Sequence, residues 1–383
     1  MNIVIATPIY IPEIGGPATY TKELIEQLGT DHTITVVAYT EETRHPAGAT
    51  LVPISKQAIL PIRLWRFYQA VHQAAKQADV LYVQNAMAAG LPTVIAGKLS
   101  GTPVVLKFVG DESWERATQH KITTQRLQEF LDSPEENLKI KLMRHLQGWV
   151  LRQATIVTTP SVYLGELIQS AYKLQPDHVI TNYNAVEIPT EAPFTGVKKP
   201  HQLVATARLV AWKGIDGIIK AVAILRESFP DIHLVVHGDG PSRTEYENLT
   251  AELNLTSHVT FTGNVSRTET WHTRKVSAVY VLNSTYEGLP HTALTSFAAK
   301  IPIVATDIPG TNEAVYHEQT GLLVEPNNPQ QLAEAITRLF ADPALQTTLV
   351  DNAWDSIHET FSWPAHIKKL LEIFESSRNK PVH

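Results

Sequence analysis

Short apolar runs recur along the first half of the chain, and segments with helical periodicity separate them. The runs have the character of buried strands, and they lie at residues 3–6, 34–39, 80–83, 104–108 and 155–158. Apolar residues at helical spacing occupy residues 19–28 and 63–77, between successive runs. Strands that alternate with helices predict a parallel sheet with helices on both of its faces.

The second half of the chain repeats this pattern. Its expected strands are residues 203–206, 233–237, 259–262, 278–282 and 303–306, and its expected helices include 215–227 and 242–254. Between the halves, residues 188–200 hold three prolines and one glycine and lack periodicity, which is typical of a linker. The sequence therefore predicts two doubly wound α/β domains with a ligand cleft at the carboxyl ends of their strands.

Composition narrows the class of protein. The 383 residues include no cysteine, which excludes disulfides, thiolate metal sites and a cysteine nucleophile. The formal net charge is −6, so no nucleic-acid partner is expected, and all of the net charge lies after Val186. The first residues do not resemble a signal peptide, and no apolar run is long enough to span a bilayer. We expect a cytoplasmic enzyme.

Several phosphate-binding and catalytic signatures are absent from the sequence. There is no Gly-x4-Gly-Lys-Ser/Thr loop, no Gly-x-Ser-x-Gly turn and no His-Glu-x-x-His pair. A dinucleotide-binding fingerprint that begins at Gly238 fails because Arg243 stands at its third glycine. No Asp-x-Asp pair exists, so we expect no metal and no cofactor. Any bound diphosphate would be neutralised by side-chain cations and backbone N–H groups.

The first candidate segment is Gly15-Gly16-Pro17, which follows the first expected strand and precedes a helix. Glycines allow a ligand to approach the backbone, and a helix N-terminus offers free N–H groups to an anion. An ordinary strand-to-helix turn is the alternative interpretation.

The second candidate segment is residues 207–214, which again lie between a strand and a helix. The Arg208 guanidinium can hold phosphate oxygens in a fork, Lys213 supplies a point charge, and Gly214 permits a tight entry into the helix. The alternative is a pair of solvated surface cations.

The third candidate segment is residues 283–292, which leave a strand and open a helix around Glu287. A carboxylate together with backbone donors suits a ligand with many hydroxyl groups, because hydroxyls both donate and accept. The alternative is a glutamate that only caps the helix.

In this order, the segments resemble those of the retaining glycosyltransferase family 4, which has the GT-B fold. The resemblance spans nearly the whole chain and rests on the following pieces: Gly15-Gly16, Thr159-Pro160-Ser161, Asn184-Ala185-Val186-Glu187, Arg208 with Lys213, Gly238-Asp239-Gly240-Pro241, residues 261–265, Tyr286-Glu287-Gly288-Leu289-Pro290, residues 302–306 and residues 321–324. Each piece alone is modest, but the ordered set is specific.

The resemblance implies two Rossmann-like domains that face a cleft. Residues 1–187 would form the acceptor domain, residues 188–362 the nucleotide-sugar domain, and residues 363–383 a helix that crosses back to the first domain. Arg208 and Lys213 would act on the donor diphosphate, and Glu287 would lie near the donor sugar. The implied donor contacts are Gly15, Gly16, Gly238, Gly240, Asn264, Val265, Gly288, Leu289, Pro290, His291, Thr292 and Thr295.

One departure from the family is Thr295. The family places a second glutamate eight residues after Glu287, where it usually accepts hydrogen bonds from both ribose hydroxyls, but this sequence has threonine there. Loss of a charge-assisted hydrogen bond costs about 1.5–3 kcal/mol. The sequence leaves open a working enzyme with another ribose contact, or a protein that has lost transfer activity.

A second departure is the absence of a histidine that many members carry after the strand at 104–108. Asp111 is the nearest polar group there, within a Val-Gly-Asp-x-x-Trp-Glu form that some members resemble. Asp111 would either orient the donor sugar or cap the next helix.

The family implies transfer with retention, from a UDP- or GDP-sugar to a carbohydrate or lipid-linked acceptor. No nucleophile beneath the anomeric carbon is evident, so a metal-independent front-face reaction is expected, in which positioning and leaving-group stabilisation are the main tasks of the protein. Two alternatives stay open: a nucleotide-sugar epimerase of the same fold, and a binding-only relative.

Residues 137–152 form a predicted helix with four basic and no acidic residues. Its apolar residues recur at helical spacing: Leu138, Leu142, Leu146 and Trp149. Such a helix can lie on the inner face of a membrane as a peripheral contact, or its apolar stripe can pack into the domain core.

Overall fold

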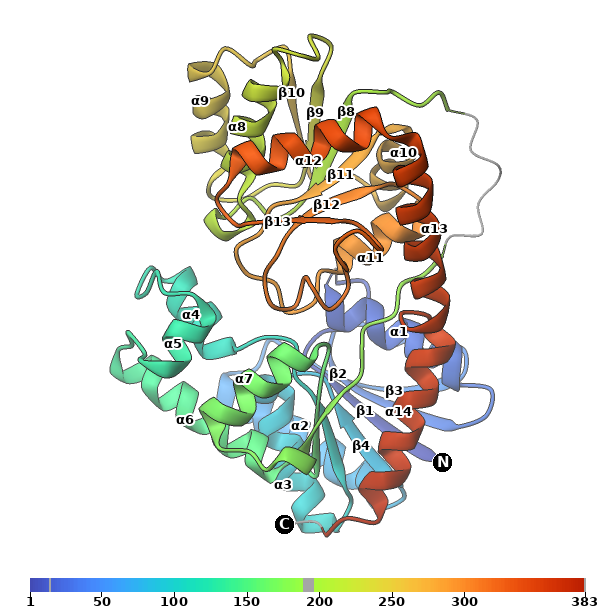
Figure 1. Ribbon diagram of the computed structural model, residues 1–383. Helices are drawn as coiled ribbons and strands as arrows, with labels where there is room; N and C mark the ends of the chain where they lie inside the picture. Colours follow the sequence, from blue (N-terminus) through green and yellow to red (C-terminus); the bar gives the residue numbers. More distant parts are fainter. Residues whose placement is uncertain (14, 189–195, 382–383) are drawn as a thin grey trace. The chain divides into compact units, whose positions relative to one another are not determined.

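The computed structural model describes residues 1–13, 15–188 and 196–381, and it forms two compact units (Figure 1). Unit 1 is Met1–Asn182 with Ile367–His383, and unit 2 is Tyr183–His366. Of the linker predicted at 188–200, residues 189–195 lie outside the described residues. In the described part, no helix is long and apolar enough to cross a membrane.

Unit 1 is built on a parallel sheet of seven strands in the order β3-β2-β1-β4-β5-β6-β7. The strands are β1 (Asn2–Thr7), β2 (Thr33–Tyr39), β3 (Ala49–Ile54), β4 (Val80–Val83), β5 (Val104–Lys107), β6 (Ile156–Thr159) and β7 (Val179–Thr181). The helices are α1 (Gly16–Leu28), α2 (Leu60–Ala75), η1 (Ala86–Gly90), α3 (Leu91–Ser100), α4 (Glu112–Gln119), α5 (Leu127–Asp132), α6 (Leu138–Gln153), α7 (Val162–Tyr172) and η2 (Pro176–His178).

The order of the strands places the helices of unit 1 on two faces. α2 connects β3 to β4, α3 connects β4 to β5, and α6 lies in the connection from β5 to β6. All three connections cross the sheet in the same direction. Because such crossovers are right-handed, the three helices lie on the same face of the sheet. The connection through α1 steps the other way and covers the opposite face. The C-terminal helix α14 (Trp363–Arg378) also packs on unit 1, where the Phe374 ring lies 5.3 Å from the Tyr82 ring and Arg378 pairs with Asp79 at 3.2 Å.

Unit 2 is built on a parallel sheet of six strands in the order β10-β9-β8-β11-β12-β13. The strands are β8 (Gln202–Thr206), β9 (His233–His237), β10 (Val259–Gly263), β11 (Val279–Leu282), β12 (Ile303–Thr306) and β13 (Leu322–Val324). The helices are η3 (Ala211–Lys213), α8 (Ile215–Leu225), α9 (Arg243–Glu252), α10 (Arg267–Val276), α11 (His291–Ala298), α12 (Pro329–Ala341) and α13 (Pro343–Glu359). Two buried apolar clusters, around Ile219 and around Phe297, hold these helices to the sheet.

All ten predicted strands are present, and the two parallel sheets confirm the predicted fold class. Three strands were not expected from the sequence: β3, β7 and β13. Each lies at an edge of its sheet, and β7 and β13 have only three residues each. The helix predicted at 19–28 begins earlier, at Gly16, because Pro17 suits the first turn of a helix.

Candidate functional site

The carboxyl edge of the six-stranded sheet carries most of the residues predicted to bind a donor. All strands of this sheet run parallel, so the loops that follow β8, β9, β10 and β11 emerge at the same edge. These loops hold Arg208, Lys213, Gly238, Gly240, Asn264, Val265, Glu287, Gly288, Leu289 and Pro290, and α11 opens with His291 and Thr292.

Lys213 and Glu287 form an ion pair at this edge. The Lys213 Nζ atom lies 2.6 Å from Glu287 Oε1, and the Ser284 hydroxyl donates to the same oxygen at 2.6 Å. The exposed fraction of the side chain is 22% for Lys213 and 10% for Glu287. The cation and the carboxylate are therefore held in one place, with the cation the more open to a ligand.

Close contacts between two loops fix this pair. Gly214 has φ of 61°, and a Cβ atom there would lie 2.1 Å from the Asn283 carbonyl oxygen. The Asn283 side chain donates to the Gly214 carbonyl oxygen at 2.8 Å, and the Thr285 N–H donates to the Trp212 carbonyl oxygen at 2.8 Å. Glycine is needed here for both conformation and space, as the sequence indicated for the entry into α8.

Arg208 is exposed and forms no ion pair with any described residue. Gly238 and Gly240 pack against its loop: a Cβ atom would lie 2.0 Å from the Ala207 carbonyl oxygen at Gly238, and 2.4 Å from the Leu209 carbonyl oxygen at Gly240. Packing within the protein thus requires glycine at both positions, whether or not a ligand binds. Their contact with a donor stays a prediction, as does that of Asn264 and Val265.

Helix N-termini add backbone donors to this edge. α8, α9 and α11 begin without a hydrogen bond from a capping side chain, and their N-cap residues are Gly214, Ser242 and Pro290. In contrast, α10, α12 and α13 are capped by the side chains of their own N-cap residues. α8 begins just after Lys213, and α11 begins just after Glu287. The uncapped N–H groups of both helices suit an anion.

Two residues at this edge were missed by the sequence analysis. Thr206 ends β8 and His237 ends β9, and the two are register partners. Thr206 Oγ1 and His237 Nε2 are buried without a hydrogen-bond partner, and burial lowers the pKa of His237. Buried polar atoms without partners are uncommon and often lie at sites that bind water or ligand. Both residues end predicted strands, which is the signal that could have singled them out.

Thr295 lies in the second turn of α11 and is half-buried. Its hydroxyl donates to the Thr292 carbonyl oxygen at 3.0 Å. The single proton of this side chain is thus used within the helix, and its oxygen can only accept from a ligand.

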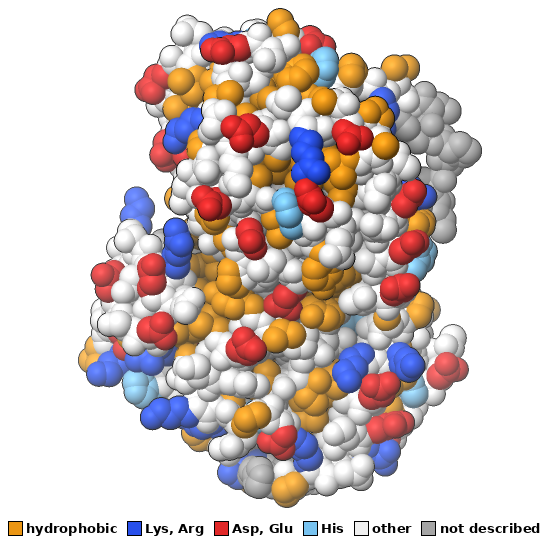
Figure 2. Space-filling view, in the orientation of Figure 1, with side chains coloured by type: hydrophobic (Ala, Val, Ile, Leu, Met, Phe, Trp, Pro, Cys, Tyr) orange, Lys and Arg blue, Asp and Glu red, His pale blue; other side chains and the backbone are white. Residues whose placement is uncertain are grey.

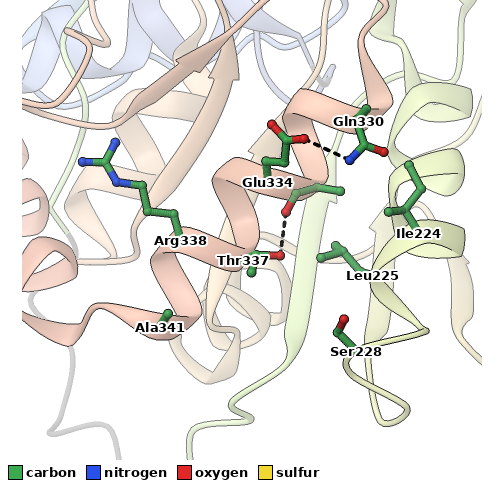
Figure 3. A pocket seen from close by; sticks show the side chains of 9 residues that line it. Ile224, Leu225, Ser228, Gln330, Glu334, Thr337, Arg338 and Ala341 are labelled. Atoms are coloured by element: carbon green, nitrogen blue, oxygen red, sulfur yellow. Dashed lines mark hydrogen bonds between the residues drawn. The ribbon is translucent and has the colours of Figure 1, made fainter.

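A hollow between α8 and α12 is separate from the sheet edge (Figure 3). Two of its polar side chains bond within α12: Gln330 donates to Glu334 at 2.9 Å, and Thr337 donates to the Ala333 carbonyl oxygen at 2.9 Å. A third, Arg338, pairs with Glu318. None of the predicted site residues lines it. Within the described residues, no cluster of three His, Asp or Glu side chains could hold a metal ion.

Gly15 and Gly16 belong to unit 1, at the start of α1. Gly15 is the N-cap residue of α1 and has no side chain to cap the helix. A Cβ atom at this position would lie 2.4 Å from the end of the Ile9 side chain. At Gly16 a Cβ atom would meet nothing within 4 Å. Space for a ligand is thus present beside Gly16, and its contact with a donor stays a prediction.

Asp111 is fully buried at the N-cap of α4. Its Oδ1 atom accepts from the Trp114 N–H at 2.9 Å and from the Ser113 hydroxyl, and its Oδ2 atom accepts from Gln147 Nε2 at 2.7 Å and from the Tyr172 hydroxyl. These are the contacts of a helix cap tied to two other helices. Neither oxygen is left free to face a sugar in this arrangement, which favours the cap over the predicted sugar contact.

Lys107, at the end of β5, is a buried cation that the sequence analysis passed over. Its Nζ atom lies 4.2 Å from the centre of the Tyr20 ring, and the Tyr20 and Tyr82 hydroxyl oxygens are 3.0 Å apart. Burial lowers the pKa of Lys107 to about 7. An apolar strand that ends in lysine at the carboxyl edge is the signal that could have drawn attention to it.

The lowered pKa of Lys107 predicts that the free energy of unfolding rises with pH above about 7. Between pH 7 and 8 the folded protein has largely lost this proton while the unfolded chain keeps it, so stability should increase by about 1 kcal/mol. Urea unfolding at both pH values measures the increase, and in Lys107→Met this contribution should vanish. An equal pH dependence in the variant would contradict the assignment.

Comparisons with known proteins agree with this architecture. The glycosyl transferase 4-like domain matches residues 15–185, and the family of glycosyl transferases group 1 matches residues 189–355. An uncharacterised glycosyltransferase of Methanocaldococcus jannaschii is 28% identical over 233 residues, which cover 57% of this chain and 59% of that protein. The lipopolysaccharide core biosynthesis glycosyltransferase LpsD of Rhizobium meliloti is 32% identical over 173 residues, which cover 45% and 49% of the two chains.

The match to solved structures extends over both units. Anabaena HepE, solved in complex with UDP, has a TM-score of 0.74 and 17% sequence identity, with 98% of this chain and 100% of that chain covered. The sequence matches, in contrast, span about half the length of the curated relatives. The chain belongs to the GT-B glycosyltransferases that join a 4-like domain to a group 1 domain.

Proposed function

We propose that the protein is a retaining glycosyltransferase that moves a hexosyl group from a UDP- or GDP-sugar to a hydroxyl group of a carbohydrate or lipid-linked acceptor. The observation that carries this proposal is the Lys213–Glu287 pair at 2.6 Å, which puts a fixed cation and a carboxylate beside two uncapped helix N-termini. The cation and the N–H groups suit a diphosphate, and the carboxylate suits sugar hydroxyls. HepE, of the same fold, is described in complex with UDP.

In the proposed front-face reaction, the bond between the anomeric carbon and the donor phosphate oxygen breaks while the bond to the acceptor oxygen forms on the same face. The proton of the acceptor hydroxyl passes to the departing phosphate oxygen. Lys213 and Arg208 stabilise the negative charge that develops on the leaving diphosphate, and Glu287 keeps Lys213 in position. Because these side chains supply the positive charge, the proposed reaction needs no divalent cation.

Incubation with a panel of nucleotide sugars tests the proposal. Transfer, or slow hydrolysis of the donor, releases nucleoside diphosphate in amounts that depend on Lys213. An epimerase of the same fold would produce a new nucleotide sugar without release. A binding-only relative would give neither product but would still bind nucleotide in calorimetry.

The binding-only alternative was raised because Thr295 stands where the family has a second glutamate. A variant at this position tests whether the threonine weakens donor binding or whether the pocket holds the ribose through other residues. A glutamate there could accept from both ribose hydroxyls, and we expect Thr295→Glu to tighten nucleoside diphosphate binding roughly five- to thirtyfold, or about 1–2 kcal/mol. Thr292 is half-buried one turn earlier, and a ribose contact there would reduce the gain. Ser296 is fully buried, and its hydroxyl donates to the Thr292 carbonyl oxygen at 2.8 Å. Calorimetry on both proteins measures the change.

Thr295→Gln is the matched control, because it has the length of glutamate without the charge, and its gain should be smaller. Weaker binding in a folded Thr295→Glu protein would show that the pocket is built around threonine and that other residues hold the ribose.

A further inference from the structure

Three adjacent helices of unit 1 share one outer surface. α2, α3 and α6 cover the same face of the seven-stranded sheet, and α3 packs between the other two. Lys98 of α3 donates to Gln153 of α6 at 2.9 Å, which joins the two helices at their C-terminal ends. We call the outward side chains of these three helices, with Ile59 at the start of α2, the helix face.

The helix face exposes an unusual amount of apolar side chain. Leu138 is 84% exposed and Leu142 is 69% exposed, so the apolar stripe of α6 does not pack into the core at these positions. Nine of the fourteen large apolar side chains exposed in the described part of the chain lie on the helix face: Ile59, Leu60, Ile62, Trp65, Ile95, Leu99, Leu138, Leu142 and Trp149. Apolar side chains gathered on one surface indicate an interaction site.

The charge of the helix face selects the kind of partner. α2, α3 and α6 contain seven Lys and Arg residues and no Asp or Glu, in a chain with a net charge of −6. Arg63 lies over the buried Tyr39 ring, whereas five of the other six are exposed: Arg66, Lys98, Lys139, Lys141 and Arg152. Of the seven cations only Arg144 pairs with a carboxylate of the described residues, that of Glu136, at 2.8 Å. Figure 2 shows blue and orange side chains together over the part of unit 1 where Figure 1 places α6. The partner should therefore be both anionic and apolar.

We propose that the helix face docks on the surface of an anionic phospholipid bilayer. Exposed residues of α6 recur at 138, 142, 145 and 149, which places them in one stripe along the helix and suits a helix that lies in the plane of the membrane. Trp65 and Trp149 suit the headgroup region, because the indole ring is apolar with one polar edge. Lys139 and Lys141 are exposed beside Leu138 and Leu142 and meet the lipid phosphates.

Flotation with vesicles tests this surface without any donor or acceptor, so its outcome is independent of the proposed glycosyl transfer. The protein should float with phosphatidylcholine vesicles that contain about one third phosphatidylglycerol, not with phosphatidylcholine alone, and binding should weaken in high salt. Lys139→Glu with Lys141→Glu should lower the bound fraction at least about tenfold. Leu138→Gln with Leu142→Gln should also lower it, and the exposure of both leucines leaves the fold intact.

The matched control is Lys368→Glu with Lys369→Glu, which makes the same change of charge on exposed positions of α14 in the same unit. This variant should bind vesicles like the wild type. No flotation with anionic vesicles, or an equal loss in the control, would overturn the proposal. Light scattering that shows a dimer broken by Leu138→Gln with Leu142→Gln would overturn it as well, because the face would then bind a second copy of the chain.

Discussion

Replacing Lys213 with alanine should lower turnover by about 100-fold or more, which corresponds to about 2.7 kcal/mol of transition-state stabilisation. Lys213 is held 2.6 Å from Glu287 and remains partly open at the sheet edge, so its charge is in place before the leaving group forms. The enzyme should also keep its activity in EDTA, because the proposed charge stabilisation comes from Lys213 and Arg208. Steady-state kinetics on wild type and variant, with and without EDTA, measure both effects.

Lys220→Ala is the control for Lys213→Ala. Lys220 lies on α8 of the same unit and pairs with Asp216 at an exposed position, so its loss should leave turnover unchanged. Lys213→Ala leaves the buried Glu287 with the Ser284 hydroxyl as its one side-chain partner among the described residues. Thermal unfolding must therefore show that the variant is folded at the assay temperature. A mild effect of Lys213→Ala, or strict dependence on a divalent cation, would contradict the assignment of Lys213 to the diphosphate.

The central strands of both sheets could be predicted because they are buried on both faces and therefore read as continuous apolar runs. β1 and β8, for example, each have neighbours on both sides, and their apolar residues are buried throughout. The edge strand β3 could not be predicted in this way, because partial exposure permits polar residues and even Pro53 within it. β7 and β13 have only three residues each, which is too short for a recognisable run, although β13 is entirely apolar.

The candidate site could be predicted as a set of loops but not as a set of contacts. Parallel strands bring their carboxyl ends together, so the loops of Arg208, Lys213 and Glu287 were expected at one edge. The bond between Lys213 and Glu287 spans 74 positions of the chain, and no local pattern specifies it. The role of Asp111 was equally beyond local patterns, because a helix cap and a sugar contact both need an acidic residue after a strand. The residues that distinguish the two roles, Gln147 and Tyr172, come 36 and 61 positions later in the chain.

Asp111→Ala should destabilise the protein by about 3–5 kcal/mol, an effect on folding rather than on the chemical step. The variant would take the Asp111 acceptor from the Trp114 N–H and from the buried Ser113 and Tyr172 hydroxyls. The Gln147 amide would keep only its bond to the Tyr172 hydroxyl oxygen at 2.7 Å. Burial, together with the Asp111 charge, raises the pKa of Tyr172, so this hydroxyl stays protonated and keeps donating. Urea unfolding of wild type and variant measures the loss.

Asp111→Asn distinguishes the cap from a sugar contact, because it keeps one acceptor for Ser113 and Trp114 but turns an N–H group toward Gln147 and Tyr172. We expect a smaller loss of stability than for alanine, and turnover that is close to normal wherever the variant is folded. Tyr172→Phe removes one donor to Asp111 and the hydroxyl that accepts from Gln147, and it should cost about 1.5–3 kcal/mol. If Asp111→Asn instead had wild-type stability and lost turnover, Asp111 would act on the donor sugar, and the buried network would have to open when the substrate binds.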